Sequence, residues 1–211
     1  ADIDGFTKYV QKHLTDNTED LVRALHVLRS ELDAVVESDF GGRRVRFIGD
    51  CLHGVLLEGT SKTTDVEATI STATLCAGAL RSGFKRALEF LADKDVDVDA
   101  LGLAIGFDLG PLSLTRLGMK GDKVRCSTGR VVGRSEDEQK RCTGSQSAIG
   151  EAAYKSASKA VQELFGASRR VSGLRYDTAV DTLEATGDRV AKAVYAEAVA
   201  QHMPAVAPSL N

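Results

Sequence analysis

The chain has 211 residues, enough for one large domain, and hydrophobic residues make up 43% of it. A net charge of −3 gives no electrostatic reason to expect nucleic acid or an anionic membrane as a partner. The four cysteines are widely spaced and form no C-x-x-C pair, which favours a reduced, cytoplasmic protein. No apolar run approaches the roughly 20 residues that a membrane-spanning helix needs.

The first half of the chain predicts helices that alternate with a strand pair. A helix is expected over residues 16–38, because a cap-forming segment precedes acidic residues and a periodic row of leucines. Residues 43–49 and 51–59 predict a β-hairpin that turns near Gly49 and Asp50. A second, longer helix is expected over residues 63–93, with small residues along one side.

The second half predicts a mixture of strands and helices. The pattern indicates a hairpin formed by residues 100–110 and 111–118, and then a strand around residues 123–127. Two helices follow, over residues 136–144 and 150–166, and late strands are expected within residues 173–199. The order of elements predicts an α+β fold, with a mainly antiparallel sheet and covering helices on one face. We expect residues 1–200 to form a single domain and residues 201–211 to form a flexible tail.

Two aspartates stand out in this pattern. Asp2 lies in "ADIDGFT", at the end of a strand-like segment and just before a glycine and a helix start. Asp50 follows Gly49 between the strands of the first hairpin. Taken singly, each is ordinary turn or cap chemistry. Taken together, they place two carboxylates beside the free N–H groups of a helix start, which suits a metal-bound polyphosphate.

These segments resemble a known family. "ADIDGFT" is similar to the A-D-I-x-G-F-T opening of class III nucleotidyl cyclases, and "VRFIGDCLHGVL" resembles their second metal-binding hairpin. "GLAIGFDLGPLSLTRLG" resembles a glycine-rich strand pair of the same family. The resemblance covers residues 1 to about 130, and it implies the ferredoxin-like palm domain of that family.

The resemblance also implies a site and a reaction. Asp2, the Ile3 carbonyl and Asp50 would hold two Mg²⁺ or Mn²⁺ ions, and the ribose 3′-hydroxyl would attack the α-phosphorus with loss of pyrophosphate. Backbone amides of the following loop would cradle the phosphate oxygens. The residues implied in phosphate binding are Asp4, Gly5, Phe6 and Thr7; Asp4 could instead cap or support the site, and the Phe6 ring belongs in the core.

The chain departs from the family pattern at the substrate end. Arg46 stands where adenylyl cyclases carry lysine and guanylyl cyclases glutamate, and Cys126 stands at the second base-reading position. The family's ribose-binding Asn and transition-state Arg correspond to Gly133 and Asp137. Nearby substitutes for those two residues are Arg134, Gln139 and Arg141, and we select Arg134 and Arg141 as catalytic candidates. Arg189 or Lys192 could replace the late triphosphate lysine.

In combining the metal ligands with altered base-reading residues, the chain resembles the Pycsar-type pyrimidine cyclases of bacterial antiphage defence. Arginine presents only donors, and these fit the two carbonyls of uracil better than cytosine, so UTP is favoured and CTP comes next. The alternatives are a purine cyclase, a cyclase-like module that binds a nucleotide without converting it, and a plain interaction domain. The family further implies a head-to-tail homodimer, in which one protomer supplies the metal ligands and its partner the base readers.

Overall fold

The computed structural model describes residues 1–184, apart from the side chains of residues 15, 16 and 48. The expected tail over residues 201–211, the last part of the expected domain 1–200, and Arg189 and Lys192 all lie outside the described residues. The strands are β1 Asp2–Asp4, β2 Arg43–Ile48, β3 Cys51–Val55, β4 Gly102–Phe107, β5 Ser113–Met119, β6 Asp122–Thr128, β7 Gln146–Ile149 and β8 Arg170–Ser172. The helices are α1 Phe6–Asp16, α2 Thr18–Ala34, the π-helix η1 Val35–Asp39, α3 Val66–Ala92, α4 Arg130–Lys140, α5 Glu151–Ser156, α6 Lys159–Phe165 and α7 Tyr176–Glu184.

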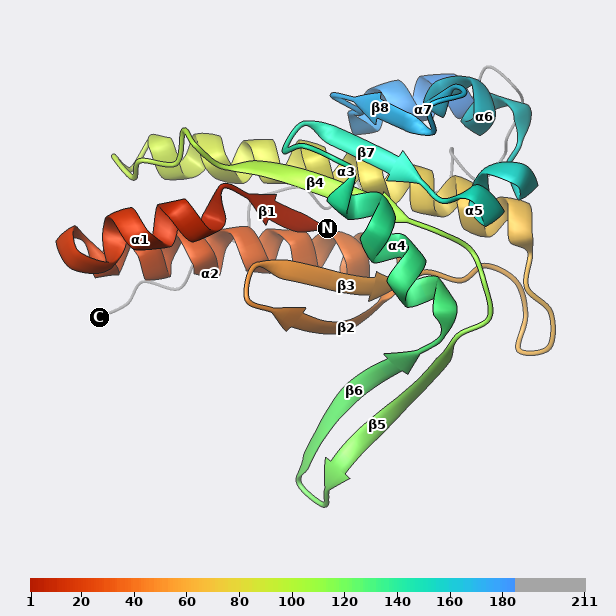
Figure 1. Cartoon of the computed structure of the whole chain (residues 1–211), viewed down its shortest axis with the longest axis horizontal. Coiled ribbons are helices and arrows are strands. Elements are labelled where there is room, and N and C mark those ends of the chain that lie inside the picture. The colour runs from red at the N-terminus through yellow and green to blue at the C-terminus, as the bar shows by residue number, and fades with distance from the viewer. Residues whose placement is uncertain (185–211) are drawn as a thin grey trace.

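A six-stranded sheet in the order β2-β3-β1-β4-β7-β8 forms the centre of the molecule (Figure 1). Its neighbouring strands pair antiparallel except β4 and β7, which pair parallel. The expected α+β class with a mainly antiparallel sheet is therefore confirmed. The placement of β1 between β3 and β4 brings the N-terminal strand and the first hairpin side by side, which matters for the site below.

The helices lie on both faces of the sheet, so the expectation of covering helices on one face only is wrong. Leu103 and Ile105 of β4 join the main core with α2 and α3, where Leu28 and Leu32 have no exposed surface. Gly106 points the other way, and a Cβ there would lie 2.1 Å from the Gln139 backbone nitrogen of α4. Because side chains alternate along a strand, α4 covers the face opposite the main core, and it lies in front of the sheet in Figure 1.

The two early helices agree with the sequence prediction. The side chain of Asn17 accepts a hydrogen bond from the Asp20 amide at 3.3 Å and so caps α2, and the side chain of Asp65 caps α3 through the Ala68 amide at 3.0 Å. The expected helix over residues 16–38 changes character near its end, because Val35–Asp39 form a π-turn.

Three predictions for the second half are wrong. Residues 100–110 and 111–118 form no hairpin, because buried β4 pairs with β1 and β7 while β5, exposed along its whole length, pairs with β6. Residues 150–166 form two short helices, since Ser158 starts a new one by capping α6. The described part of residues 173–199 contains α7 rather than strands, because Ala179, Val180 and Leu183 form a buried helical face.

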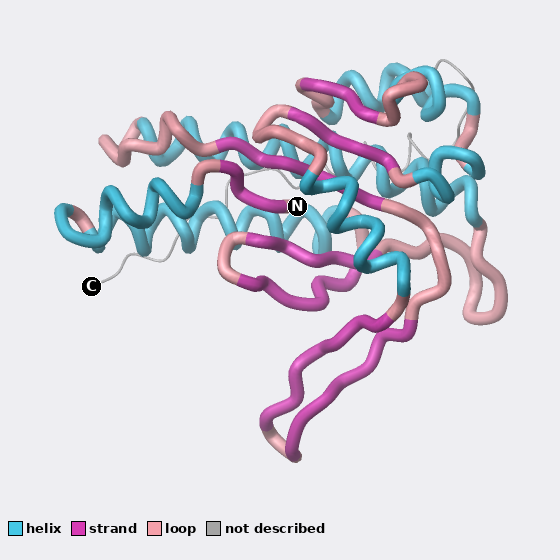
Figure 2. The backbone as a smooth tube through the Cα atoms, in the orientation of Figure 1, coloured by secondary structure: helices cyan, strands magenta, loops and turns pink. Residues whose placement is uncertain are grey.

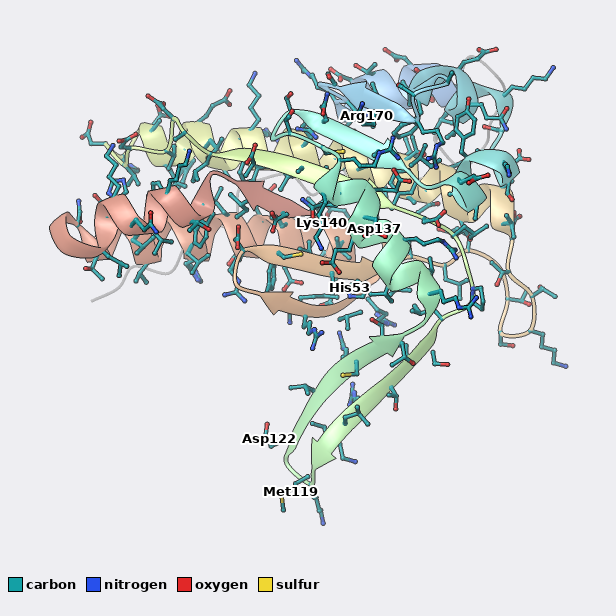
Figure 3. The ribbon with its side chains drawn as sticks, in the orientation of Figure 1. His53, Met119, Asp122, Asp137, Lys140 and Arg170 are labelled. Carbon is teal, nitrogen blue, oxygen red and sulfur yellow. The ribbon has the colours of Figure 1, made fainter. Side chains whose placement is uncertain are left out.

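The pair β5–β6, which we call the arm (Ser113–Thr128), is a separate two-stranded sheet that projects from the body (Figure 2). Figure 3 places Met119 and Asp122 at its tip. Apolar side chains are exposed along it, and Met119 has 82% of its surface accessible. The strand expected around residues 123–127 is thus confirmed as β6, which lies in the exposed arm and not in the central sheet.

Candidate active site

The two predicted metal carboxylates lie close together in the structure. Asp2 of β1 pairs directly with Cys51, the first residue of β3, and Asp50 immediately precedes Cys51 in the turn that joins β2 and β3. Burial raises the pKa of the Asp50 carboxyl above its usual range, and the negative charge of Asp2 raises it further. Residues 48 positions apart in the sequence therefore share one local electrostatic environment, as the sequence predicted.

This carboxylate pair suits a divalent cation. Within residues 1–184, neither Asp2 nor Asp50 forms an ion pair, although the Ala1 ammonium group attracts Asp2 electrostatically. A bound cation would reduce the repulsion between the two carboxylates. No cluster of three or more His, Cys, Asp or Glu side chains gathers in that part of the chain. Mg²⁺ is commonly bound by one or two carboxylates together with water and substrate phosphate, and this donor set fits that pattern. Ile3 is only 1% exposed as a whole residue, and metal ligation by its backbone carbonyl stays a prediction.

The loop between β1 and α1 is held tightly. Gly5 caps α1 with φ +83°, and a Cβ at this position would lie 2.4 Å from the Ala100 carbonyl oxygen. Phe6 packs partly buried against the core, 6.3 Å from the ring of Tyr9, while Thr7 is exposed in the first helical turn. The loop therefore presents its backbone rather than its apolar side chain, as an anion-binding helix start does.

Asp4 is engaged within the protein. Its carboxylate accepts a hydrogen bond from the Gly144 backbone N–H at 2.8 Å, in the loop before β7. This contact fastens the end of β1 to a segment 140 residues away. The sequence left two roles open for Asp4, phosphate binding and structural support of the site. This hydrogen bond favours structural support, and direct phosphate binding by the side chain stays a prediction.

The two predicted base readers stand on neighbouring strands of different sheets. Arg46 is exposed on β2, opposite His53 of β3 and just past an irregularity in the pairing. Cys126 is half-buried on β6, opposite Thr115 of β5. Strand β6 runs beside β2, so the arm brings Cys126 toward the strand that carries Arg46.

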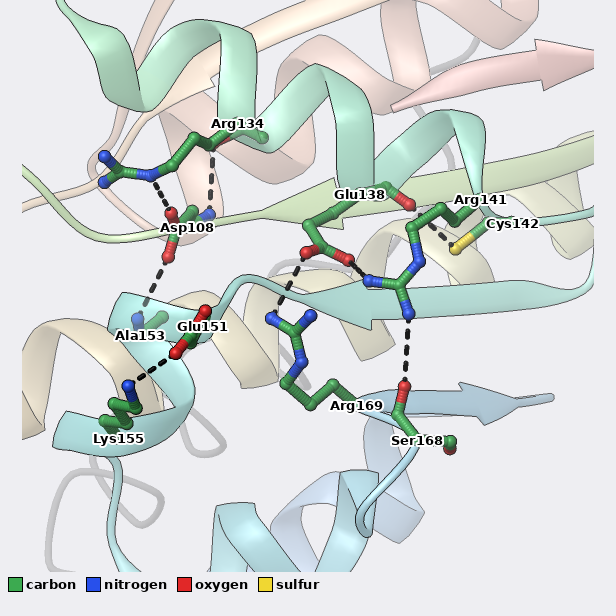
Figure 4. Close-up of polar contacts among 11 residues, drawn as sticks. Asp108, Arg134, Glu138, Arg141, Cys142, Glu151, Ala153, Lys155, Ser168 and Arg169 are labelled. Atoms are coloured by element: carbon green, nitrogen blue, oxygen red, sulfur yellow. Dashed lines mark hydrogen bonds and ion pairs between the residues drawn. The ribbon is translucent and has the colours of Figure 1, made fainter.

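The two predicted catalytic arginines, Arg134 of α4 and Arg141 directly after it, both pair with carboxylates of the protein (Figure 4). The Arg134 Nε lies 2.5 Å from Asp108, whose side chain is 1% exposed and also accepts a bond from the Ala153 amide at 3.0 Å. Arg134 further donates to the Leu109 carbonyl at 2.8 Å. In the arrangement described, Arg134 therefore joins α4 to the start of α5.

Arg141 belongs to a second such cluster. Its guanidinium pairs with Glu138, whose other carboxylate oxygen lies 3.2 Å from Arg169, and it donates to the Ser168 carbonyl at 3.4 Å (Figure 4). By contrast, the positions aligned with the family's Asn and Arg face open space: a Cβ at Gly133 would meet no atom within 4 Å, and Asp137 is exposed. A catalytic role for Arg134 or Arg141 remains a prediction that requires release from these partners.

The sequence reading assigned no role to three residues beside the candidate base readers. The ring of His53 is half-buried, its Nδ1 lies 3.4 Å from the Ser127 hydroxyl, and burial lowers its pKa. Glu37 and Arg125 form an ion pair at 2.8 Å between η1 and β6. Their positions, 88 residues apart, gave no local signal of this contact.

None of the helices within the described chain combines the length and the apolar character required to cross a membrane.

Comparisons with known proteins agree with this geometry. No family model matches the sequence. A protein named uridylate cyclase from Pseudomonas aeruginosa is 56% identical over 200 residues, which are 95% of this chain and 39% of that protein. A second uridylate cyclase, from a Rhizobium species, is 45% identical over 167 residues, 78% of this chain and 31% of that protein.

A solved structure gives the same result. A class III adenylyl cyclase-like ATP-binding protein from Pseudomonas aeruginosa superposes with a TM-score of 0.83 at 56% identity, covering 86% of this chain and 38% of that one. The chain thus spans less than two fifths of the length of each of these relatives. The fold, the paired carboxylates and these similarities lead to one assignment: through this domain, the chain belongs to the class III nucleotidyl cyclase family.

Proposed function

We propose that this chain is a nucleotidyl cyclase catalytic domain that converts UTP to 3′,5′-cyclic UMP and pyrophosphate. The observation that carries the proposal is the convergence of Asp2 and Asp50 beside the Gly5 loop, where their charges are coupled. The name uridylate cyclase, borne by two relatives at 56% and 45% identity, supports UTP as the substrate. CTP is the next candidate, and ATP or GTP the purine alternative. The Pycsar-type resemblance suggests that the product is a second messenger in antiphage defence.

The residues have distinct roles in this proposal. Asp2, the Ile3 carbonyl and Asp50 would hold two Mg²⁺ or Mn²⁺ ions, which when bound supply Lewis-acid activation and charge neutralisation at the triphosphate. The amides of the Gly5 loop would orient the phosphate oxygens, and the positive end of the α1 dipole would favour their negative charge. Gly5 keeps this loop close to Ala100, so the backbone is preorganised before substrate arrives.

Base recognition would come from the other side of a composite site. The guanidinium of Arg46 would donate to uracil carbonyl oxygens, with Cys126 as the second base contact. In a head-to-tail homodimer, these two side chains would come from one protomer and the carboxylates from its partner. Arg134 and Arg141 are the proposed cations for the transition state, and each would have to exchange its protein carboxylate for phosphate.

A second candidate is a nucleotide-binding module without turnover. It is favoured by the description of the 56% identical solved structure as an adenylyl cyclase-like ATP-binding protein. A binding module would still use the Gly5 loop and the base readers. It would not need the matched pair of metal carboxylates.

One assay separates the candidates. The purified chain is incubated with Mn²⁺ and each of ATP, GTP, CTP and UTP, and released pyrophosphate and cyclic nucleotide are measured. We expect turnover chiefly with UTP and its near-complete loss in Asp50→Ala. Binding without pyrophosphate release would favour the module, and turnover that survives Asp50→Ala would overturn the metal-site assignment.

Mixing variants tests the composite site. An Asp50→Ala chain and an Arg46→Ala chain are each expected to be inactive or weak. Together they should regain part of the activity, because one of the two sites in a mixed dimer is then intact. Absence of recovery would indicate a site formed within one protomer.

A further inference from the structure

The candidate base readers are held by different parts of the fold. Arg46 belongs to β2 in the central sheet, whereas Cys126 belongs to β6 in the projecting arm. Two strands alone are marginally stable in water, so the arm needs contacts with the body to keep a fixed direction. The spacing between Arg46 and Cys126 therefore depends on whatever joins β6 to β2.

The polar contacts at this junction converge on one residue of β2. The Arg125 Nη1 donates to Glu37 at 2.8 Å and to the Arg44 carbonyl at 2.9 Å. The same Glu37 oxygen accepts the Arg44 backbone N–H at 3.1 Å. Glu37 and Arg125 thus hold both backbone groups of Arg44 at once. The neighbouring contact between Ser127 and His53, at 3.4 Å, ties the next inward-facing residue of β6 to β3.

The π-helix places Glu37 for this contact. In η1 the Phe40 N–H bonds to the Val35 carbonyl at 3.2 Å, and the Gly42 N–H bonds to the Val36 carbonyl at 2.8 Å. Single π-turns inside helices occur frequently at functional positions. Here the turn lies at the end of α2, directly before β2, and presents a carboxylate to the first residues of that strand.

The ion pair is partly sheltered from water. The side chains of Arg125 and Glu37 are 33% and 31% exposed. The hydrogen bond between them joins two charged groups, and such bonds are stronger than those between neutral groups. The hydrogen bond from Arg125 also lowers the pKa of the Glu37 carboxyl, which stays ionised at neutral pH. A fully exposed ion pair would contribute little to holding the arm in one direction. This pair is partly sheltered, and it also holds the N–H and the carbonyl of Arg44.

We propose that Glu37 and Arg125 form a positioning pair that fixes the arm on β2 and thereby sets the base selectivity of the site. The inference rests on the proposed function, in which Arg46 and Cys126 read the base. Cys126 lies between Arg125 and Ser127, both of which are tied to the body. Arg125 contacts Arg44, and Ser127 contacts His53. Arg46 lies two residues after Arg44 and opposite His53, so the same contacts also surround Arg46.

The proposal separates selectivity from metal-dependent chemistry. Asp2 and Asp50 lie on β1 and in the β2–β3 turn, and neither contacts Glu37 or Arg125 through a hydrogen bond or ion pair within residues 1–184. Loss of the pair should therefore let the two base readers move relative to each other while the carboxylates stay in place. Such a change reduces discrimination between UTP and CTP more than it reduces turnover itself.

The test compares Arg125→Ala and Glu37→Gln with a matched control, Arg116→Ala. Arg116 lies opposite Arg125 in the arm and is exposed, so the control removes the same charge from the same ribbon. The measured quantity is the ratio of kcat/KM for UTP to that for CTP with Mn²⁺. We expect this ratio to fall about tenfold in Arg125→Ala, as when one well-placed polar contact is lost, and less in Glu37→Gln. Arg116→Ala should keep the ratio.

Arg125→Lys addresses the chance that Arg125→Ala folds poorly. Lysine keeps the charge, so it should restore part of the selectivity, which a merely structural defect would not predict. Equal ratios in Arg125→Ala, Glu37→Gln and the unmodified chain would overturn the proposal. A loss of kcat for both nucleotides with an unchanged ratio would also overturn it.

Hydrogen exchange tests the geometry without using activity. The Arg44 amide donates to Glu37, so it should exchange faster in Glu37→Ala than in the unmodified chain, and remain protected in Arg116→Ala. If the unmodified chain converts no nucleotide, the proposed function fails. The exchange result then tests the positioning of the arm by itself: faster exchange at Arg44 and along β6 supports the positioning pair, and unchanged exchange refutes it.

Discussion

Replacement of Gly5 by alanine tests how tightly the candidate phosphate loop is built. Gly5 has φ +83°, a conformation that costs an ordinary L-residue about 1–2 kcal/mol. The new Cβ would also lie 2.4 Å from the Ala100 carbonyl oxygen, a backbone atom that cannot rotate away. Overpacking of this kind typically costs about 1–3 kcal/mol. We therefore expect Gly5→Ala to lower the free energy of unfolding by about 3 kcal/mol.

Thermal unfolding provides the assay. For a domain of this size, about 1 kcal/mol corresponds to a Tm shift of about 2–4 °C, so Gly5→Ala should lower Tm by roughly 6–12 °C. Gly41→Ala is the matched control, because Gly41 has φ +59° but a Cβ there would meet no atom within 4 Å. Its Tm should fall less, by roughly 2–8 °C, from the backbone conformation alone. Equal shifts in the two variants would refute the close contact with Ala100. Cyclase activity should fall in Gly5→Ala and remain in Gly41→Ala.

Three further predictions concern charged side chains. Asp50→Asn should raise the Tm of the metal-free protein, because it removes a carboxylate whose charge is disfavoured by burial and, to a smaller extent, by Asp2. It should also abolish stabilisation by Mn²⁺, and a lower Tm of the metal-free variant would contradict this account. The pKa of Asp50 in the folded protein lies above its ordinary value of 3.8, so the stability that Asp50 contributes is present below pH 3.8 and is lost as the pH rises through the folded pKa. Unfolding curves of the metal-free protein from about pH 3.5 to 7 should show this loss of stability. Asp50→Asn should make the pH dependence flatter. Arg134→Ala should lower the free energy of unfolding by about 1–3 kcal/mol, since buried Asp108 loses its partner, whereas Arg134→Lys should retain most of the stability; an active but destabilised Arg134→Ala would assign the arginine a structural role alone.

The approach of Asp2 to Asp50 was predictable because its signals are local. The glycine after Ile3 and Asp4 and the glycine before Asp50 each mark a turn with a carboxylate beside it. The pairing of β1 with β3 brings Asp2 and Asp50 together. Only the association between two motifs had to be inferred, and the family resemblance supplied it.

The recognition half could not be predicted to the same extent. The sequence of β5 is compatible with pairing to β4, and it is excluded only because β1 and β7 occupy both edges of β4. The pairing of Glu37 with Arg125 depends on how the arm leaves the body, which no short segment encodes. Residues such as Arg134 carried a plausible chemical role in the sequence, while the structure shows the carboxylate that already holds it.

The arm has a consequence for how the protein behaves in solution. In a ribbon of two strands each strand is an edge, so both outer rows of backbone groups are available to another chain. Apolar side chains such as Leu117 and Met119 are exposed on the same ribbon, which adds to the tendency to aggregate. Exposed charged side chains recur along it at short intervals and oppose such pairing; they are Arg116, Lys120, Asp122 and Lys123. Because salt at about 1 M reduces the screening length to roughly 3 Å, concentrated salt would weaken this protection. The charge pattern of the arm therefore sets the ionic strength above which the protein is expected to precipitate through its own strands.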